Sequence, residues 1–359
     1  QPLLTGQGYK RTTAKRFHVY RKQKVLELVT ESGKSVTGTY NHPLLVVSGM
    51  KREWKRLDEI KPGERVAVVP RIQCTKTALV KTGWKKKPRK YGPKSRAKLP
   101  KQLDARTAGF LGYVLGDGWV RRTCVAMDVN TEEEDLIPLL ASTIQDKFGL
   151  TPSIRVRKKK GKKPITIMEC NSVDVAHNLC FLKQKRVPAL VFESGNEVAA
   201  SFLSWLFEAD GCVFSKGRGR RAIQLKSSEN KLLRDVQMLL LRFGVHSRII
   251  GRNLAIRRAK SIRKFAKRVG FQSEKKRGKL KKLVKDVEGL HHERGRELSE
   301  RVVSVKPAGA ADVFDVEAPP EKRFIANGII SHNTGKSSIL EYVSRLAPKS
   351  VAVSGGGTR

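Results

Sequence analysis

The sequence is poor in acidic residues and cysteine and has no long apolar run. Only 33 of its 359 residues are Asp or Glu, against 74 Lys and Arg, which gives a formal net charge of +41. No apolar run reaches about 18 residues, so no transmembrane helix is expected. The five cysteines show no C-x-x-C spacing, which argues against a zinc site and predicts reduced thiols in a cytoplasmic protein.

The charge excess predicts a polyanionic partner. A soluble protein with this imbalance repels itself unless it meets opposite charge. Nucleic acid is the leading candidate, and an anionic membrane surface is the alternative. Hydrophobic residues make up 39% of the chain, so cores for two or three domains can form.

The order of the patterns predicts a β domain that is interrupted by a mixed domain. Residues 17–30 and 35–47 alternate apolar and polar residues, as two strands joined by a turn do. Residues 73–103 are rich in Lys and Pro without a period, so we expect a basic linker or DNA-binding arm there. Short strands with Pro and Gly turns return at 301–333.

Helices and strands alternate in the middle of the chain. An amphipathic helix is expected at 131–150, capped by Thr131 with acids in its first turn, and a second at 230–245. The order of helix, strand and helix recurs, which predicts an internal duplication with halves at about 104–195 and 196–300.

Two apolar segments with small residues each end in an Asp-Gly pair. They are residues 108–119, which contain Asp117, and residues 201–212, which contain Asp210. The helix dipole is negative at the C-terminus, so an acid there is electrostatically unfavourable. Two such acids brought together repel, and a divalent cation relieves that repulsion. The alternative is that each pair only ends a buried helix and starts a turn.

Small residues predict that these two helices pack closely. Gly109, Gly112 and Gly116 share one helical face that has almost no side chain. The second segment contributes small groups at Ser201, Ser204 and Ala209. The two aspartates are therefore expected side by side, where Mg²⁺ could activate water for phosphodiester cleavage.

Both segments resemble the LAGLIDADG signature of homing endonucleases in the two-motif, single-chain form. The resemblance implies two αββαββα halves, a monomeric pseudo-dimer, and paired sheets over the major groove of a long asymmetric target in double-stranded DNA. It implies that Asp117 and Asp210 bind the catalytic Mg²⁺, with Gly116 and Ala209 at the helix crossing.

The same resemblance points to one basic residue near the scissile phosphate in each half. The family's lysine block is similar to KRVPALV, which indicates Lys185, and to SEKKRGKL, which indicates Lys276. The alternative is an ordinary solvated or DNA-backbone lysine, as in a DNA-binding protein that no longer cuts. Metal-dependent cleavage of a long duplex separates the two readings.

The run FIANGIISHNT closely resembles the C-terminal splice junction of inteins. It ends at His332, Asn333 and Thr334. In that family the asparagine side-chain amide attacks its own carbonyl carbon and cuts the chain, while the histidine moves the proton. The threonine hydroxyl is the nucleophile beyond the cut. The resemblance assigns these roles here, and splicing then needs no cofactor.

Three further features extend the intein resemblance. The run VFDVEAP places Asp315 where the family has an acid that assists the last nucleophile, and GTYNHPLLV matches a T-x-x-H block with Thr39 and His42. The family often has a histidine shortly before the junction run, whereas this chain has Lys322 and Arg323, so another group must assist.

The resemblances together imply a multidomain chain. An all-β Hint-type splicing domain, residues 1–72 and 301–333, is interrupted by an α+β LAGLIDADG endonuclease domain at 104–300. The chain begins with Gln1 rather than the Cys or Ser that opens an intein. We therefore expect that an N-terminal intein segment or N-extein is a missing partner.

Residues 334–359 resemble the downstream half of a nucleotide-binding loop. Gly335, Lys336 and Ser337 match the end of G-x-x-x-x-G-K-[ST], but Ile330 stands where the first glycine belongs. The segment is similar to the archaeal minichromosome maintenance replicative helicase, and another AAA+ ATPase is the alternative. The expectation is that ATP binds only to the spliced host.

Overall fold

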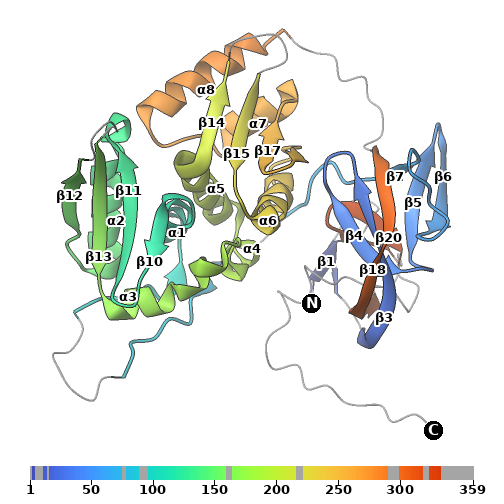
Figure 1. Cartoon of the computed structure of the whole chain (residues 1–359), viewed down its shortest axis with the longest axis horizontal. Helices are drawn as coiled ribbons and strands as arrows, with labels where there is room; N and C mark the ends of the chain where they lie inside the picture. Colours follow the sequence, from blue (N-terminus) through green and yellow to red (C-terminus); the bar gives the residue numbers. More distant parts are fainter. Residues whose placement is uncertain are drawn as a thin grey trace. The chain divides into compact units, whose positions relative to one another are not determined.

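The computed structural model divides the chain into two compact units (Figure 1). The first unit combines Gln1–Gln73 with Glu293–Arg359, and the second is Cys74–His292. The structure describes residues 2–4, 11–13, 16–74, 78–88, 96–158, 164–215, 221–289, 299–317 and 323–332. Among these residues, no helix is long and apolar enough to cross a membrane.

The first unit is built from antiparallel strands. An eight-stranded sheet has the order β19-β20-β5-β7-β18-β3-β4, and β6 pairs with β5 off this path. Its strands are β3 (Arg16–Thr30), β4 (Ser35–Thr39), β5 (Pro43–Ser48), β6 (Lys51–Arg56), β7 (Arg65–Ala67), β18 (Ser299–Glu317), β19 (Arg323–Ala326) and β20 (Ile329–His332). A separate pair joins β1 (Pro2–Leu4) and β2 (Arg11–Thr13). Strands from both ends of the sequence therefore share one sheet.

Alternation of apolar residues explains the core of this unit. In β3, Leu26 and Leu28 are both buried and lie two residues apart, so they point to the same face of the sheet. They pack in one cluster with Leu44, Val66 and Ile329. The predicted strand at 17–30 is confirmed by β3.

The prediction of one returning strand at 35–47 is wrong, because a turn divides it into β4 and β5. The backbone N–H of His42 donates to the Thr39 carbonyl at 3.0 Å and closes this turn. Pro43 has no N–H to donate, which suits the first residue of a strand. The turn leaves His42 completely buried.

The second unit repeats one topology twice (Figure 1). One sheet has the order β10-β11-β13-β12 and the other the order β14-β15-β17-β16, so the first, second, fourth and third strands neighbour each other in both. The strands are β10 (Gly118–Val120), β11 (Cys124–Asn130), β12 (Ser153–Arg157), β13 (Ile165–Asn171), β14 (Gly211–Phe214), β15 (Ala222–Lys226), β16 (Arg248–Ile250) and β17 (Asn253–Ile256). The predicted duplication is thus visible in the strand order.

Helices accompany each sheet. The first half contains α1 (Ala105–Asp117), the 3-10 helix η1 (Thr131–Glu133), α2 (Leu136–Phe148), α3 (Val173–Asn178), the 3-10 helix η2 (Cys180–Gln184) and α4 (Ala189–Glu193). The second half contains α5 (Asn196–Asp210), α6 (Asn230–Leu241), α7 (Ala259–Arg268) and α8 (Glu274–Asp286).

Helices α1 and α5 cross with their backbones in contact. A Cβ added to Gly112 would lie 2.3 Å from the Phe202 carbonyl oxygen, closer than real atoms approach. A Cβ on Gly109 would meet the Trp205 ring at the same distance, so the absent side chain makes room for the large one. The predicted glycine face is confirmed. Ser204 is not part of the crossing, since its Oγ donates to the Gly270 carbonyl instead.

Two further expectations meet the structure here. The cap predicted at Thr131 is wrong, because Asn130 caps η1 through its side-chain oxygen and Thr131 is already helical. Within 73–103, the strands β8 (Val80–Lys81) and β9 (Gln102–Leu103) pair with each other, and the Trp84 ring stacks on Phe148 of α2. These described parts lie on the second unit, and a DNA-contacting role for the segment stays a prediction.

Candidate functional site

Asp117 and Asp210 are the last residues of α1 and α5, and a glycine follows each one. Gly118 begins β10 and Gly211 begins β14, so the chain passes from helix to strand without a loop. A Cβ added to Gly211 would lie 2.3 Å from the Phe207 carbonyl oxygen. The tight junction therefore requires the glycine that follows each aspartate.

The two carboxylates share one half-buried environment. Asp210 Oδ2 lies 3.3 Å from the place of a Cβ on Gly116, next to Asp117. Burial raises the pKa of Asp117 to about 7, and the charge of Asp210 adds to this rise while Lys276 opposes it. Burial also raises the pKa of Asp210, against the charges of Lys185 and Lys276. The pair resists double ionisation, so a cation is favoured between them.

Both predicted lysines reach carbonyl groups at these helix ends. Lys185 Nζ donates to the Leu115 carbonyl at 2.6 Å, and Lys276 Nζ donates to the Glu208 carbonyl. Each carbonyl lies two residues before the aspartate of its helix. Because the last carbonyls of a helix have no partner within it, they attract donors and cations. Lys185 and Lys276 thus occupy equivalent places, one in each half.

The donor set fits a hard divalent cation. Among the residues that the structure describes, no cluster of three or more His, Cys, Asp or Glu side chains could hold a metal. The centre offers two carboxylates, on Asp117 and Asp210, directly after the crossing where Gly116 meets the Ala209 side chain. Mg²⁺ commonly takes one or two carboxylates and keeps waters and substrate phosphates as its other ligands. Two aspartates therefore suit Mg²⁺ better than a soft metal.

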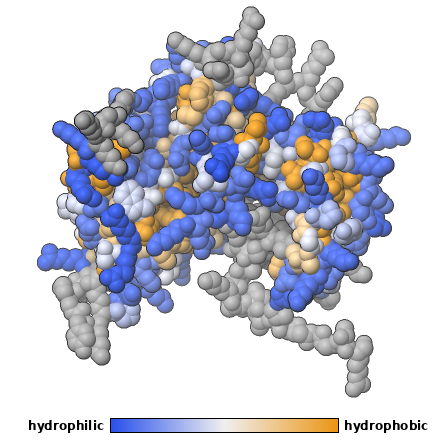
Figure 2. Space-filling view, viewed as in Figure 1, coloured by the Kyte–Doolittle hydropathy of each residue, from blue (hydrophilic) through white to orange (hydrophobic). Residues whose placement is uncertain are grey.

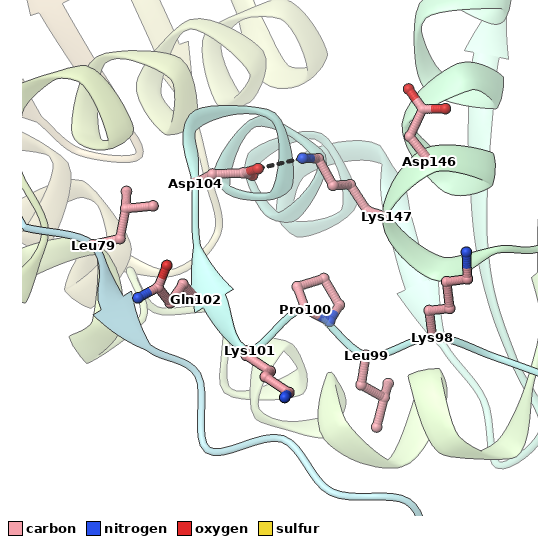
Figure 3. A pocket seen from close by; sticks show the side chains of 9 residues that line it. All are labelled: Leu79, Lys98, Leu99, Pro100, Lys101, Gln102, Asp104, Asp146 and Lys147. Carbon is pink, nitrogen blue, oxygen red and sulfur yellow. Dashed lines mark hydrogen bonds and ion pairs between the residues drawn. The ribbon is translucent and has the colours of Figure 1, made fainter.

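A pocket of about 350 Å³ lies at the other end of α1 (Figure 3). Asp104, the N-cap of α1, lines it and forms an ion pair with Lys147 of α2. Because α1 has 13 residues, the pocket is about 20 Å from Asp117. The other lining residues are Leu79, Lys98, Leu99, Pro100, Lys101, Gln102 and Asp146. This pocket is separate from the aspartate pair.

In the first unit, two histidines come together from opposite ends of the sequence. Strand β20 pairs with β5 at Ser331 and Leu44, which sets His332 near His42. Burial lowers the pKa of His42 to about 4, and the charge of His332 adds to the effect. Neither ring nitrogen of His42 has a hydrogen-bond partner among the described residues. The His332 ring packs edge-on against Trp54, with centroids 4.8 Å apart.

The structure describes only some of the other residues predicted for the site of this unit. Thr39 lies on the turn that holds His42, and its Oγ1 donates to Asn41 Oδ1 at 2.8 Å. Asp315 lies in β18 opposite His18 of β3, and its side chain is outside the described part of the structure. Also outside the described residues are Asn333, Thr334, Gly335, Lys336 and Ser337.

Sequence reasoning missed two acids beside Lys276. Glu133 Oε1 lies 3.5 Å and Glu208 Oε1 lies 3.7 Å from Lys276 Nζ. Glu133 was read only as one of the acids in a helix's first turn. A comparison of the two Asp-Gly segments carried a signal for Glu208, because Leu115 occupies the matching position of the first segment.

The chain matches the model of the intein splicing domain family over residues 5–333. Its two units combine a strand-built histidine site with a duplicated fold that carries paired aspartates. Since the match covers most of the sequence, the chain belongs to the intein splicing domain family.

The relatives that match this chain are proteins with different names. The replicative DNA helicase DnaB of Rhodothermus marinus is 24% identical over 86% of this chain and 40% of its own length. The tRNA-splicing ligase RtcB of Pyrococcus horikoshii is 26% identical over 88% of this chain and 39% of its own length. The chain therefore spans well under half of either relative.

Solved structures of homing endonucleases are similar to part of the chain. One is described as I-DmoI in complex with DNA and Ca. It is 15% identical, covers 49% of this chain and 97% of its own, and has a TM-score of 0.39.

Proposed function

We propose that the second unit is a metal-dependent endonuclease that cuts both strands of a specific DNA duplex. The observation that carries this proposal is the pair of equivalent helix ends. Asp117 and Asp210 meet there with raised pKa values, and each half supplies one lysine, Lys185 or Lys276, at the matching carbonyl. Each half thus supplies one carboxylate and one lysine, which suits cleavage of one DNA strand by each half.

The reaction is hydrolysis of a phosphodiester. The oxygen of a water molecule forms a bond to phosphorus, one P–O ester bond breaks, and the leaving oxygen takes up a proton. Asp117 and Asp210 would hold Mg²⁺, which would supply charge to activate water and stabilise the leaving oxygen. The chain's own lysines place positive charge beside the phosphate, where negative charge grows in the transition state. Hydrophilic residues cover much of the face in Figure 2.

The test replaces each aspartate by its neutral isostere. Asp117→Asn or Asp210→Asn is expected to reduce double-strand cleavage with Mg²⁺ by about 10³-fold or more, because a cation between them loses a charged ligand. Binding of the duplex should survive, since most affinity comes from phosphate contacts. Asp146→Asn, an exposed acid of α2 that pairs with Arg106, is the matched control. Full cleavage by both site variants would remove the assignment.

The alternative is a DNA-binding protein that does not cut. It predicts tight binding of one duplex and no cleavage with Mg²⁺, Mn²⁺ or any other divalent cation. The like charges of the half-buried acids argue against it, because two structural acids gain nothing from being brought together.

We infer a second activity for the first unit, self-cleavage of the chain after Asn333. The observation that favours it is the meeting of His42 with His332, the residue before Asn333. The side-chain amide nitrogen of Asn333 attacks its own carbonyl carbon, the peptide bond to Thr334 breaks, and the Thr334 nitrogen takes a proton. Neutral His42, with His332 beside it, is suited to move that proton. Thr39 and Asp315 are proposed to assist the preceding acyl shifts.

The protein into which this intein is inserted, its host, is proposed from residues 334–359 alone. We propose an archaeal minichromosome maintenance helicase, with Gly335, Lys336 and Ser337 completing an ATP-binding loop after splicing. Another AAA+ ATPase is the alternative. ATP binding by the spliced host, and none by the unspliced chain, is the measurement that tests this proposal.

A further inference from the structure

The two helix ends of the second unit differ at one equivalent position. Leu115 stands two residues before Asp117, whereas Glu208 stands two residues before Asp210. Both backbone carbonyls accept a hydrogen bond from the lysine of their half. The backbone arrangement is therefore the same, and the side chains make the difference.

Glu208 fixes the segment that carries Lys276. Its fully buried carboxylate accepts hydrogen bonds from the Gln272 N–H at 2.7 Å and the Ser273 N–H at 3.1 Å. The Ser273 hydroxyl donates to the same carboxylate at 2.6 Å. Since Ser273 is the N-cap of α8, these bonds set where the helix begins. The carboxylate also lies 3.7 Å from Lys276 Nζ.

A second carboxylate reaches Lys276 from the other half. Glu133 of η1 is buried, and its Oε1 lies 3.5 Å from Lys276 Nζ. Two neighbours of Glu133 hold the same helix, since Asp135 accepts from the first backbone N–H of α8 at 2.8 Å and Glu132 pairs with Lys275. The acids of η1 and the N-cap of α2 thus clamp the first turn of α8.

Lys185 is not restrained in this way. Its Nζ donates to the carbonyls of Leu115 at 2.6 Å and Gly116 at 3.5 Å, and no carboxylate in the described part of the chain forms an ion pair with it. The next residue, Arg186, takes the acid instead and forms two bonds to Asp235, at 2.7 and 2.8 Å. The ammonium of Lys185 is therefore held by carbonyl oxygens and not by an ion pair.

We propose that Glu133 is a positioning residue that holds the Lys276 ammonium back from the DNA, so that the two strands of the duplex break at unequal rates. This inference rests on the proposed endonuclease function. A phosphate oxygen must compete with two carboxylates, 3.5 and 3.7 Å away, for Lys276. Lys185 forms no ion pair in the described part of the chain and interacts only with the more distant charge of Asp210. Charge-assisted bonds of the kind that hold Lys276 are strong. The strand that depends on Lys276 is cut second, and a nicked duplex accumulates.

The test follows each strand separately. The full chain is incubated with Mg²⁺ and a duplex recovered from a randomised library by its cleavage, with a different dye on each strand. Lys185→Met and Lys276→Met identify the strand that depends on each lysine. The Lys276-dependent strand is expected to break about tenfold more slowly, the ratio that corresponds to one charge-assisted bond. Glu133→Gln should remove most of this difference and leave the rate of the other strand unchanged.

Glu134→Gln is the matched control, because this neighbouring acid is exposed and forms no ion pair with Lys276 among the described residues. Both strand rates should be unchanged in it. Equal strand rates in the unaltered chain would overturn the inference, as would Glu133→Gln changing both rates together or neither, or lysine variants that slow both strands alike. In those cases the endonuclease assignment stands. Failure to recover any duplex cut on either strand would overturn the assignment itself and the inference with it.

Discussion

The two units bring their reactive groups together by different means. In the first, the neighbouring strands β5 and β20 come from opposite ends of the sequence and set His332 near His42. In the second, α1 and α5 pack at backbone contact and their last residues, Asp117 and Asp210, meet. The first arrangement depends on strand register, and the second on side-chain volume at a helix crossing.

Burial shifts the pKa values at the two sites in opposite directions. It lowers the pKa of His42 to about 4 and raises the pKa of Asp117 to about 7, and in both cases the neutral form is favoured. A neutral imidazole suits proton transfer within the chain. A pair of acids that resists ionisation suits a cation from outside. Under the proposed functions, the first site acts alone, whereas the second requires a metal and DNA.

The largest effect is expected at the peptide bond between Asn333 and Thr334. Asn333→Ala should abolish release of the peptide that begins at Thr334, because no other side chain can close the succinimide ring. His332→Ala should slow the release. Mass spectrometry after prolonged heating measures both products, and Asp117→Asn serves as a control that should release normally. Release at the usual rate from Asn333→Ala would contradict self-cleavage at this bond.

The next effect is a difference in salt dependence between the two units. Residues 74–292 hold 49 of the 74 Lys and Arg residues but 19 of the 33 acids, so most of the charge excess belongs to the second unit. If about eight phosphates are contacted, DNA affinity should fall ~10³-fold or more between about 50 and 200 mM salt. Peptide release should hardly change. A flat plot of log affinity against log salt would contradict DNA binding.

Local signals predicted the elements that position the aspartates. The glycine spacing in 108–119 fixed one bare helical face, and the helix crossing followed from it. The break between β4 and β5 was missed although Asn41 and Pro43 are both residue types that favour turns. The wrong cap at Thr131 arose because Asn130 beside it is also a capping residue and the side-chain bond decides between them.

Pairings between distant residues could not be predicted from the sequence. The contacts of Lys276 with Glu133 and Glu208 depend on how η1, α5 and α8 pack, and no local pattern records that. The same holds for His332 against Trp54. In a chain with 74 basic residues, resemblance to a known motif was what selected Lys185 and Lys276 from the rest.

A smaller effect is expected from acid on the first unit. The folded pKa of His42 is about 4 and the ordinary value is 6.5, so the unfolded chain binds the proton more readily. Stability is therefore complete above pH 6.5 and is lost as the pH falls towards 4, by about 3 kcal/mol in total. Amide hydrogen exchange of the Leu44 and Val66 segments, corrected for intrinsic rates, measures it. His42→Phe should lose this part of the pH dependence, and an unchanged slope would contradict the assignment.

The last prediction tests the volume limit at the helix crossing. Gly112→Ala should destabilise the second unit by about 1–3 kcal/mol, because its Cβ would lie 2.3 Å from the Phe202 carbonyl oxygen and the helices must separate. Separation moves Asp117 from Asp210, so DNA cleavage should fall further than the loss of stability alone explains. Amide exchange in α1 and α5 and strand cleavage at low temperature measure the two effects.

Gly278→Ala is the matched control, since Gly278 also lies inside a helix, α8, but a Cβ there has no neighbour within 4 Å. Alanine favours the helix over glycine, so this variant should be unchanged or stabler by up to about 1 kcal/mol. The same substitution thus has opposite signs at the two positions if contact at the crossing is the cause. Equal behaviour of the two variants would show that the crossing tolerates a side chain, and the aspartates would then need another explanation for their proximity.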